Sequence, residues 1–287
     1  MQSRRGILQT TAGLATVALA GCGQIPGGGD SDTTAGRYQN VVYQTPERPL
    51  AVVGQKIGAL AGIEAYTGIR ESETALGVPA TDVEYGIRVT TGRFPSIPPT
   101  YAVVLGPVDF ETVSADLEGD GTLTELDEIG GFRTLRLETA DETRFFGVDG
   151  QRGVMAQSRD HFEAVVETVN GNRTLVIEES DTFGALAEFV GEPSYVLARI
   201  GPEQTHIDGA DVPAGSLVGI DVDEGTSEYT MAVRYESEQQ AVGNEAPNRE
   251  ALVEGIPELR NVETEIDGRT LLVTATVPTT VVGEIYS

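Results

Sequence analysis

From Asp82 onward, runs rich in β-branched and aromatic residues alternate with short amphipathic segments. The runs predict β-strands, because such side chains suit the pleated, half-buried surface of a sheet. The first set of predicted strands covers residues 82–90, 101–108, 132–138, 143–150 and 152–158. Asp149-Gly150 lies between the last two and predicts a tight hairpin.

Two segments in the same region carry apolar residues at helical spacing and predict helices that lie on the sheet. They are residues 109–117, with Phe110, Val113 and Leu117 on one side, and residues 159–169, with Phe162, Val165, Val166 and Val169 on one side. Residues 50–66 are also apolar, with Gly54, Gly58 and Gly62 at four-residue spacing. Lys56 and Glu64 interrupt that run, which therefore predicts a helix or strand of the core instead of a membrane span.

A second set of strand-like runs and amphipathic segments follows toward the C-terminus. Helices are predicted over 180–190 and 248–256, strands over 194–200, 216–222 and 227–237, and a hairpin over 262–277 with its turn at Asp267-Gly268. The repetition predicts an α+β fold of two similar modules, residues 37–178 and 179–287. Each module is expected to be mainly antiparallel sheet with short amphipathic helices packed on one face.

The N-terminus has the order of an export signal. Arg4 and Arg5 precede a charge-free, mildly apolar run from Thr10 to Ala20, which leads to Cys22. A membrane-spanning helix takes about twenty apolar residues, so this run is too short to be one. Cys22 is the only cysteine in 287 residues, which excludes an internal disulfide and leaves its thiol for attachment.

Residues 3–8 resemble a twin-arginine translocation signal, and residues 19–22 resemble a lipobox. The resemblance implies a signal peptide over 1–21, export in the folded state, cleavage before Cys22 and a lipid on its sulfur. Residues 22–36 are glycine-rich without apolar periodicity and predict a flexible tether. The expected location is the outer face of the cytoplasmic membrane, at the cell surface.

Acidic side chains outnumber basic ones by 45 to 19, giving a net charge of −26, and Lys56 is the only lysine. Such repulsion opposes the compact state in dilute buffer, but at about 1 M salt the Debye length falls to about 3 Å. The composition is similar to that of haloarchaeal proteins, among which twin-arginine lipoproteins are common. It also argues against a nucleic-acid partner, because phosphates are bound by clustered lysine and arginine.

The internal segment with the sharpest motif is DLEGDGTLTELD, residues 116–127, which has the ligand spacing of a twelve-residue calcium loop. The ligands of this hypothetical calcium or magnesium site are Asp116, Glu118, Asp120, Thr122 and Asp127. Asp127 stands where the loop requires a bidentate glutamate, and the segment after Gly131 predicts a strand instead of the exiting helix. An ordinary acidic surface loop is the competing interpretation, and no other cofactor is expected.

Candidate catalytic residues are few. His161 and His206 are the only histidines, and solvated or capping roles are expected for both. Ser158, Asp160 and His161 are near neighbours along one predicted helix. Their side chains therefore point around its axis instead of toward one another, and they cannot act as nucleophile, orienting group and base. Nucleotide-binding, metalloprotease and nucleophile-elbow motifs are absent from the sequence, so we expect no enzyme.

Asn172-Arg173-Thr174 is an N-glycosylation acceptor triplet in a turn that follows a predicted helix. An exported chain would expose it to a glycosylating machinery. The surrounding order of elements also resembles, more weakly, a group of exported bacterial proteins classed as a domain of unknown function. Asp181, Phe183, Leu186 and Tyr195 carry that resemblance, which implies no activity.

The sequence therefore predicts a membrane-anchored extracytoplasmic lipoprotein with a noncatalytic binding or structural role. Its expected partners are the membrane, through the lipid, and a protein or small-molecule ligand of unknown identity. The alternative is a solute-binding lipoprotein that serves a transporter. Such proteins usually carry parallel strand–helix–strand units, whereas this sequence predicts hairpins.

Overall fold

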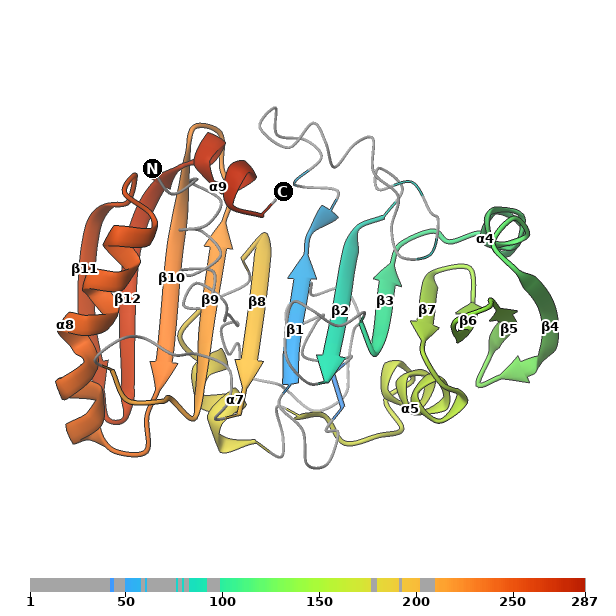
Figure 1. Ribbon diagram of the computed structural model, residues 1–287, viewed down its shortest axis with the longest axis horizontal. Helices are drawn as coiled ribbons and strands as arrows, with labels where there is room; N and C mark the ends of the chain where they lie inside the picture. Colours follow the sequence, from blue (N-terminus) through green and yellow to red (C-terminus); the bar gives the residue numbers. More distant parts are fainter. Residues whose placement is uncertain are drawn as a thin grey trace.

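Twelve strands of the computed structural model form one antiparallel sheet, with helices packed against it (Figure 1). The structure describes residues 42–43, 50–57, 60, 76, 79, 83–91, 99–176, 180–190, 193–201 and 210–286, with side chains of the last helix to Val282. The α+β class with a mainly antiparallel sheet is thereby confirmed.

The strands are β1 (Leu50–Gln55), β2 (Tyr85–Thr91), β3 (Tyr101–Leu105), β4 (Thr122–Ile129), β5 (Phe132–Glu138), β6 (Thr143–Val148), β7 (Arg152–Ala156), β8 (Tyr195–Ile200), β9 (Gly215–Asp221), β10 (Thr226–Arg234), β11 (Arg260–Asp267) and β12 (Thr270–Pro278). The helices are α4 (Phe110–Leu117), α5 (Arg159–Val169), α7 (Asp181–Ala187), α8 (Glu238–Gly255) and α9 (Thr279–Tyr286). The strand order is β11-β12-β10-β9-β8-β1-β2-β3-β7-β6-β5-β4.

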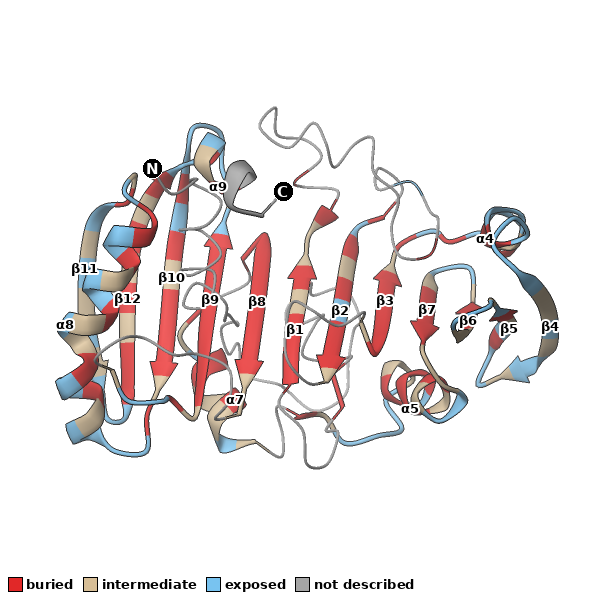
Figure 2. Cartoon of the chain, viewed as in Figure 1, coloured by how far each residue is buried: buried red, intermediate tan, exposed pale blue. Residues whose placement is uncertain are grey.

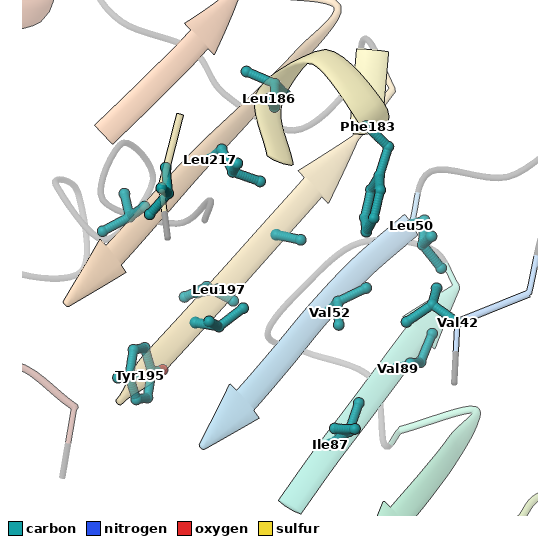
Figure 3. Close-up of a cluster of buried hydrophobic side chains, with 14 of the residues drawn as sticks. Val42, Leu50, Val52, Ile87, Val89, Phe183, Leu186, Tyr195, Leu197 and Leu217 are labelled. Carbon is teal, nitrogen blue, oxygen red and sulfur yellow. The ribbon is translucent and has the colours of Figure 1, made fainter. Parts of the chain in front are cut away.

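Strand β1 lies at the centre of the sheet and pairs with β2 on one side and β8 on the other. Its register places Val52 opposite Val89 of β2 and Ala198 of β8. Strands from both predicted modules thus belong to one continuous sheet. Figure 3 shows side chains of this centre, with Val52 and Val89 on adjacent strands and Phe183 reaching in from α7.

The helices cover both faces of the sheet. On β3, Val103 belongs to the hydrophobic cluster that contains Phe162 of α5, whereas Val104 belongs to the cluster that contains Val113 of α4. Successive side chains of a strand point to opposite faces, so α4 and α5 lie on opposite sides. The prediction that the helices pack on one face is wrong, because both faces of the central strands are apolar and each needs a cover.

Both edge strands are far more exposed than the central ones (Figure 2). β4 presents Glu125 and Asp127, and β11 presents Glu263 and Glu265, all exposed. Each edge also carries a register shift where it meets its neighbour. Charges and bulges at an edge discourage pairing with another chain, so the sheet ends at these two strands.

The predicted hairpins at Asp149-Gly150 and Asp267-Gly268 are confirmed. Both glycines have positive φ, 90° and 54°, which a tight turn requires. The structure also resolves residues 50–55 as a strand. At the C-terminus, β12 ends at Pro278, one residue beyond the predicted end of the hairpin, and α9 begins at Thr279.

Helix α8 begins ten residues before the predicted start at 248. Ser237 caps it by accepting a hydrogen bond from the backbone N–H of Gln240 at 3.2 Å. Its buried positions include Asn244 and Asn248, and Pro247 lies in its interior. A pattern search finds no apolar stripe there, because two of the inward side chains are amides.

The close packing of β6 against α5 at Gly147 supplies a test of the core. A Cβ added at Gly147 would lie 2.5 Å from Cζ of Phe162 and 3.2 Å from Cβ of Phe132, both fully buried. Gly147→Ala should lower the free energy of unfolding by about 1–3 kcal/mol, the usual cost of overpacking. The matched control is Gly119→Ala, where a Cβ would meet nothing within 4 Å. Equal denaturation midpoints for the two variants in concentrated KCl would contradict this packing.

Candidate functional site

Some of the sequence-predicted site residues lie outside the described part of the chain. These are Arg4, Arg5 and Cys22, which carry the export and lipidation hypothesis, and His206. Their predictions stand on the sequence. Among the described residues, no helix is both long and apolar enough to span a bilayer.

The five hypothetical calcium ligands are described, and they do not form a single loop. Asp116 lies in the last turn of α4 and Glu118 caps that helix, whereas Thr122 begins β4 and Asp127 lies further along the same strand. At about 3.4 Å per residue, Thr122 and Asp127 are about 17 Å apart. Pairing of β4 with β5 has replaced the predicted loop, so Asp127 is not brought to the other ligands.

No group of three or more metal-ligating His, Cys, Asp or Glu side chains occurs in the described residues. The Ser158, Asp160 and His161 triplet likewise has a local role. The Ser158 hydroxyl caps α5 by accepting a hydrogen bond from the backbone N–H of His161 at 3.2 Å.

His161 lies on α5 and belongs to an aromatic cluster with Tyr43 and Tyr101. Its Nδ1 is hydrogen-bonded to the hydroxyl of Tyr43 at 2.6 Å, and Tyr43 stacks on Tyr101 with ring centroids 5.0 Å apart. Burial raises the pKa of Tyr43 above its ordinary value, although the charge of Arg173 opposes this shift. His161 is thus tied into the structure, in contrast to the solvated or capping side chain that the sequence suggested.

The last two residues of α5 and the turn that follows it, residues 168–175 together, line a cavity of about 740 Å³. Gly171, with φ of 72°, reverses the chain, and the backbone N–H of Asn172 donates to the carbonyl of Glu167 at 2.8 Å. Arg173 places its guanidinium 4.8 Å from the ring centroid of Tyr43. The acceptor triplet thereby lies on an anchored turn, with Asn172 and Thr174 both exposed.

A second cavity, of about 430 Å³, lies at the start of α8. Its lining is polar and consists of Asp211, Glu236, Ser237, Gln239, Gln240, Gly243 and Asn244. Asn244 is 3% exposed, and its Nδ2 donates to the carboxylate of Asp211 at 3.1 Å. The Oε1 of Gln240 is buried and accepts no hydrogen bond within the described structure. The sequence analysis missed this cluster of polar side chains. The predicted helix began at 248, whereas Gln240 and Asn244 lie in the first turns of α8, which begins at Glu238.

The same helix carries its amide network into the core. The Nδ2 of Asn248, a residue with no exposed surface, donates to the hydroxyl of Tyr235 at 2.7 Å and to the carbonyl of Asn244 at 2.6 Å. Burial raises the pKa of Tyr235 to about 12, and the hydrogen bond from Asn248 partly offsets the rise. The tyrosine is therefore held neutral between the helix and the sheet.

This shift predicts a loss of stability in alkali. The pKa of Tyr235 is about 12 when folded and 10.0 ordinarily, so between these values the unfolded chain gives up the proton first. The stabilisation is complete below about pH 10 and decreases by about 2–3 kcal/mol as pH rises toward 12. Denaturant melts followed by far-ultraviolet circular dichroism would measure it, because tyrosine fluorescence is itself lost when the phenol ionises. Burial also raises the pKa of Tyr43, Tyr101 and Tyr229, so Tyr235→Phe should lower the slope in this window by the share of one tyrosine. An unchanged slope would refute the assignment.

Comparison with known proteins gives a distant structural likeness. No known protein family and no curated protein matches the chain. Crystal form IV of TP0453 superposes with a TM-score of 0.47 and 8% identity, over 88% of this chain and 99% of that chain. Crystal form I of the same protein gives 0.47 and 9%, over 87% and 97%. Neither is described as an enzyme, and a likeness at this level assigns the chain neither a family nor an activity.

Proposed function

We propose that the protein is a membrane-anchored extracytoplasmic lipoprotein with a noncatalytic binding or structural role at the cell surface. The observation that carries the proposal is the order of Arg4, Arg5, the short apolar run and the only cysteine, Cys22. Twin-arginine and lipobox motifs each occur by chance, but they rarely occur in this order and at this spacing. The acidic composition fits an environment of molar salt.

Residues 22–36 would hold the folded domain near the lipid. A glycine-rich chain of this length has an end-to-end distance of about 20 Å. The domain itself would face the exterior brine through its acidic edge strands and polar helix faces. A role in contact with other molecules is favoured, because the described catalytic candidates serve as caps and packing partners.

The alternative, a solute-binding lipoprotein that serves a transporter, would use the cavity at the start of α8. The carboxylate of Asp211, the amide of Asn244 and the unpartnered Oε1 of Gln240 would suit a small polar solute with hydrogen-bond donors. The antiparallel sheet favours the first proposal, because ligand sites at strand ends are a property of parallel sheets.

We further propose that the two halves arose by duplication of one module. In the first half, α4 follows β3, and the strands after it return so that β7 pairs with β3. In the second half, α8 follows β10, and the strands after it return so that β12 pairs with β10. This shared path supports the hypothesis, which superposition of residues 37–178 on 179–287 would test.

The lipid anchor predicts a change of partition on mutation. Wild-type protein should sediment with membranes and enter the detergent phase, and its N-terminal peptide should begin at a lipid-modified Cys22. Cys22→Ser removes the thiol that takes the lipid, so the chain should become soluble or keep residues 1–21. Cys22 is the sole thiol, so no other cysteine could substitute for it.

Arg4→Lys with Arg5→Lys is the companion variant, which keeps the charge and alters the motif. It should leave the uncleaved chain inside the cell. Native protein that keeps residues 1–21, or that stays wholly soluble after washing, would overturn the proposal.

A further inference from the structure

The turn after α5 presents an asparagine whose side-chain amide is not used by the fold. Every other asparagine that the structure describes donates a hydrogen bond through its Nδ2. Those residues are Asn170, Asn244, Asn248 and Asn261. Asn172 makes no side-chain hydrogen bond within the described structure, and it is exposed.

The contrast with Asn170 is local and sharp. Two positions earlier in the same turn, Asn170 donates to the carbonyl of Gly130 at 2.8 Å and accepts from the guanidinium of Arg152 at 3.0 Å. Asn170 therefore holds the turn to its neighbours, whereas Asn172 contributes only its backbone N–H, bonded to Glu167. The side chain of Asn172 is available for chemistry that the fold does not need.

Asn172 is also the only asparagine of the chain followed two residues later by serine or threonine. That hydroxyl is required in N-glycosylation acceptors. The hydroxyl of Thr174 is exposed and, like the amide, forms no hydrogen bond within the described structure. Two independent observations thus coincide at Asn172: its side-chain amide forms no hydrogen bond within the described structure, and it begins the acceptor triplet.

Arg173, which lies between Asn172 and Thr174, anchors the backbone of the turn. Its guanidinium lies over the ring of Tyr43 and pairs with Glu167 at 3.4 Å. The flanking Asn172 and Thr174 consequently project from a fixed segment. The adjoining cavity of about 740 Å³ offers space beside the turn for the first sugar.

We infer that Asn172 carries an N-linked oligosaccharide. The bond formed joins Nδ2 of Asn172 to the anomeric carbon of a lipid-linked oligosaccharide. The bond broken joins that carbon to the oxygen of the lipid phosphate, which leaves with the electron pair. The amide proton passes to a base of the transferase. This inference rests on the proposed export, because the donor lipid and the transferase act at the outer face of the membrane.

Export in the folded state makes accessibility decisive. A chain that crosses the membrane unfolded can be modified before it folds, at a position that is later buried. A twin-arginine substrate arrives folded, so its acceptor must already be exposed. Asn172 meets that condition, and it does so on a turn that tolerates an added group without loss of a hydrogen bond.

The test is mass spectrometry of protein purified from its native cells. Trypsin cleavage after Arg159 and Arg173 releases residues 160–173, which contain Asn172 near the end. This peptide should carry a glycan mass that is absent from Asn172→Gln and Thr174→Val. The matched control, Thr174→Ser, keeps the hydroxyl and should keep the glycan. All three variants should melt within a few degrees of one another, because these side chains are exposed and unbonded.

The N-terminal peptide separates failure of this inference from failure of the proposed function. Lipidated Cys22 together with an unmodified 160–173 peptide would overturn glycosylation and leave the anchor intact. An uncleaved N-terminus would overturn the proposed function. A second chain, with residues 1–21 replaced by the signal of a secreted protein from the same cells, then tests Asn172 separately. An unmodified peptide from that chain would overturn the inference as well.

Discussion

The pairing of β1 with both β2 and β8 is the interaction on which the rest of the structure depends. Without this strand, the elements on either side would expose two long edges of unpaired backbone N–H and C=O groups, which are costly when buried and adhesive when exposed. Leu50 and Val52 of this strand also lie in the hydrophobic cluster that contains Phe162 and Phe183, so β1 contributes to the core as well as to the pairing of strands. On β3 both faces are apolar, and α4 and α5 cover one face each.

The two outer strands, β4 and β11, leave one edge each without a strand partner in the described structure. Both carry carboxylates and bulges. In molar salt the mutual repulsion of these charges is screened to a few ångströms. They still bind water, so an acidic edge remains an effective barrier to pairing with another chain. The acidic composition thus also has a positional role in the fold.

The predictability of the fold differs between its regions for physical reasons. Hairpins turning at Asp149-Gly150 and Asp267-Gly268, and the apolar faces of α4 and α5, depend on local signals and were predicted from the sequence. β4 was not, because its loop-like ligand spacing is local, whereas its pairing with β5 is a tertiary interaction. α8 was found only in part, because its inward side chains include Asn244 and Asn248. The polar cavity beside α8 was missed for the same reason. That the side chain of Asn172 forms no hydrogen bond within the described structure could be known only from the structure.

The central strand is also the first of the twelve strands that the structure describes, and this has a consequence for the time course of folding. Leu50 lies opposite Ile200, so the sheet cannot close until the ribosome has released a segment far downstream. Contacts between such distant parts of a chain form slowly, because the entropy of closing the long loop is lost before the contacts stabilise the structure. An export route that waits for the finished domain would suit this topology. A route that threads the chain as it is made would separate β1 from β8 on opposite sides of the membrane.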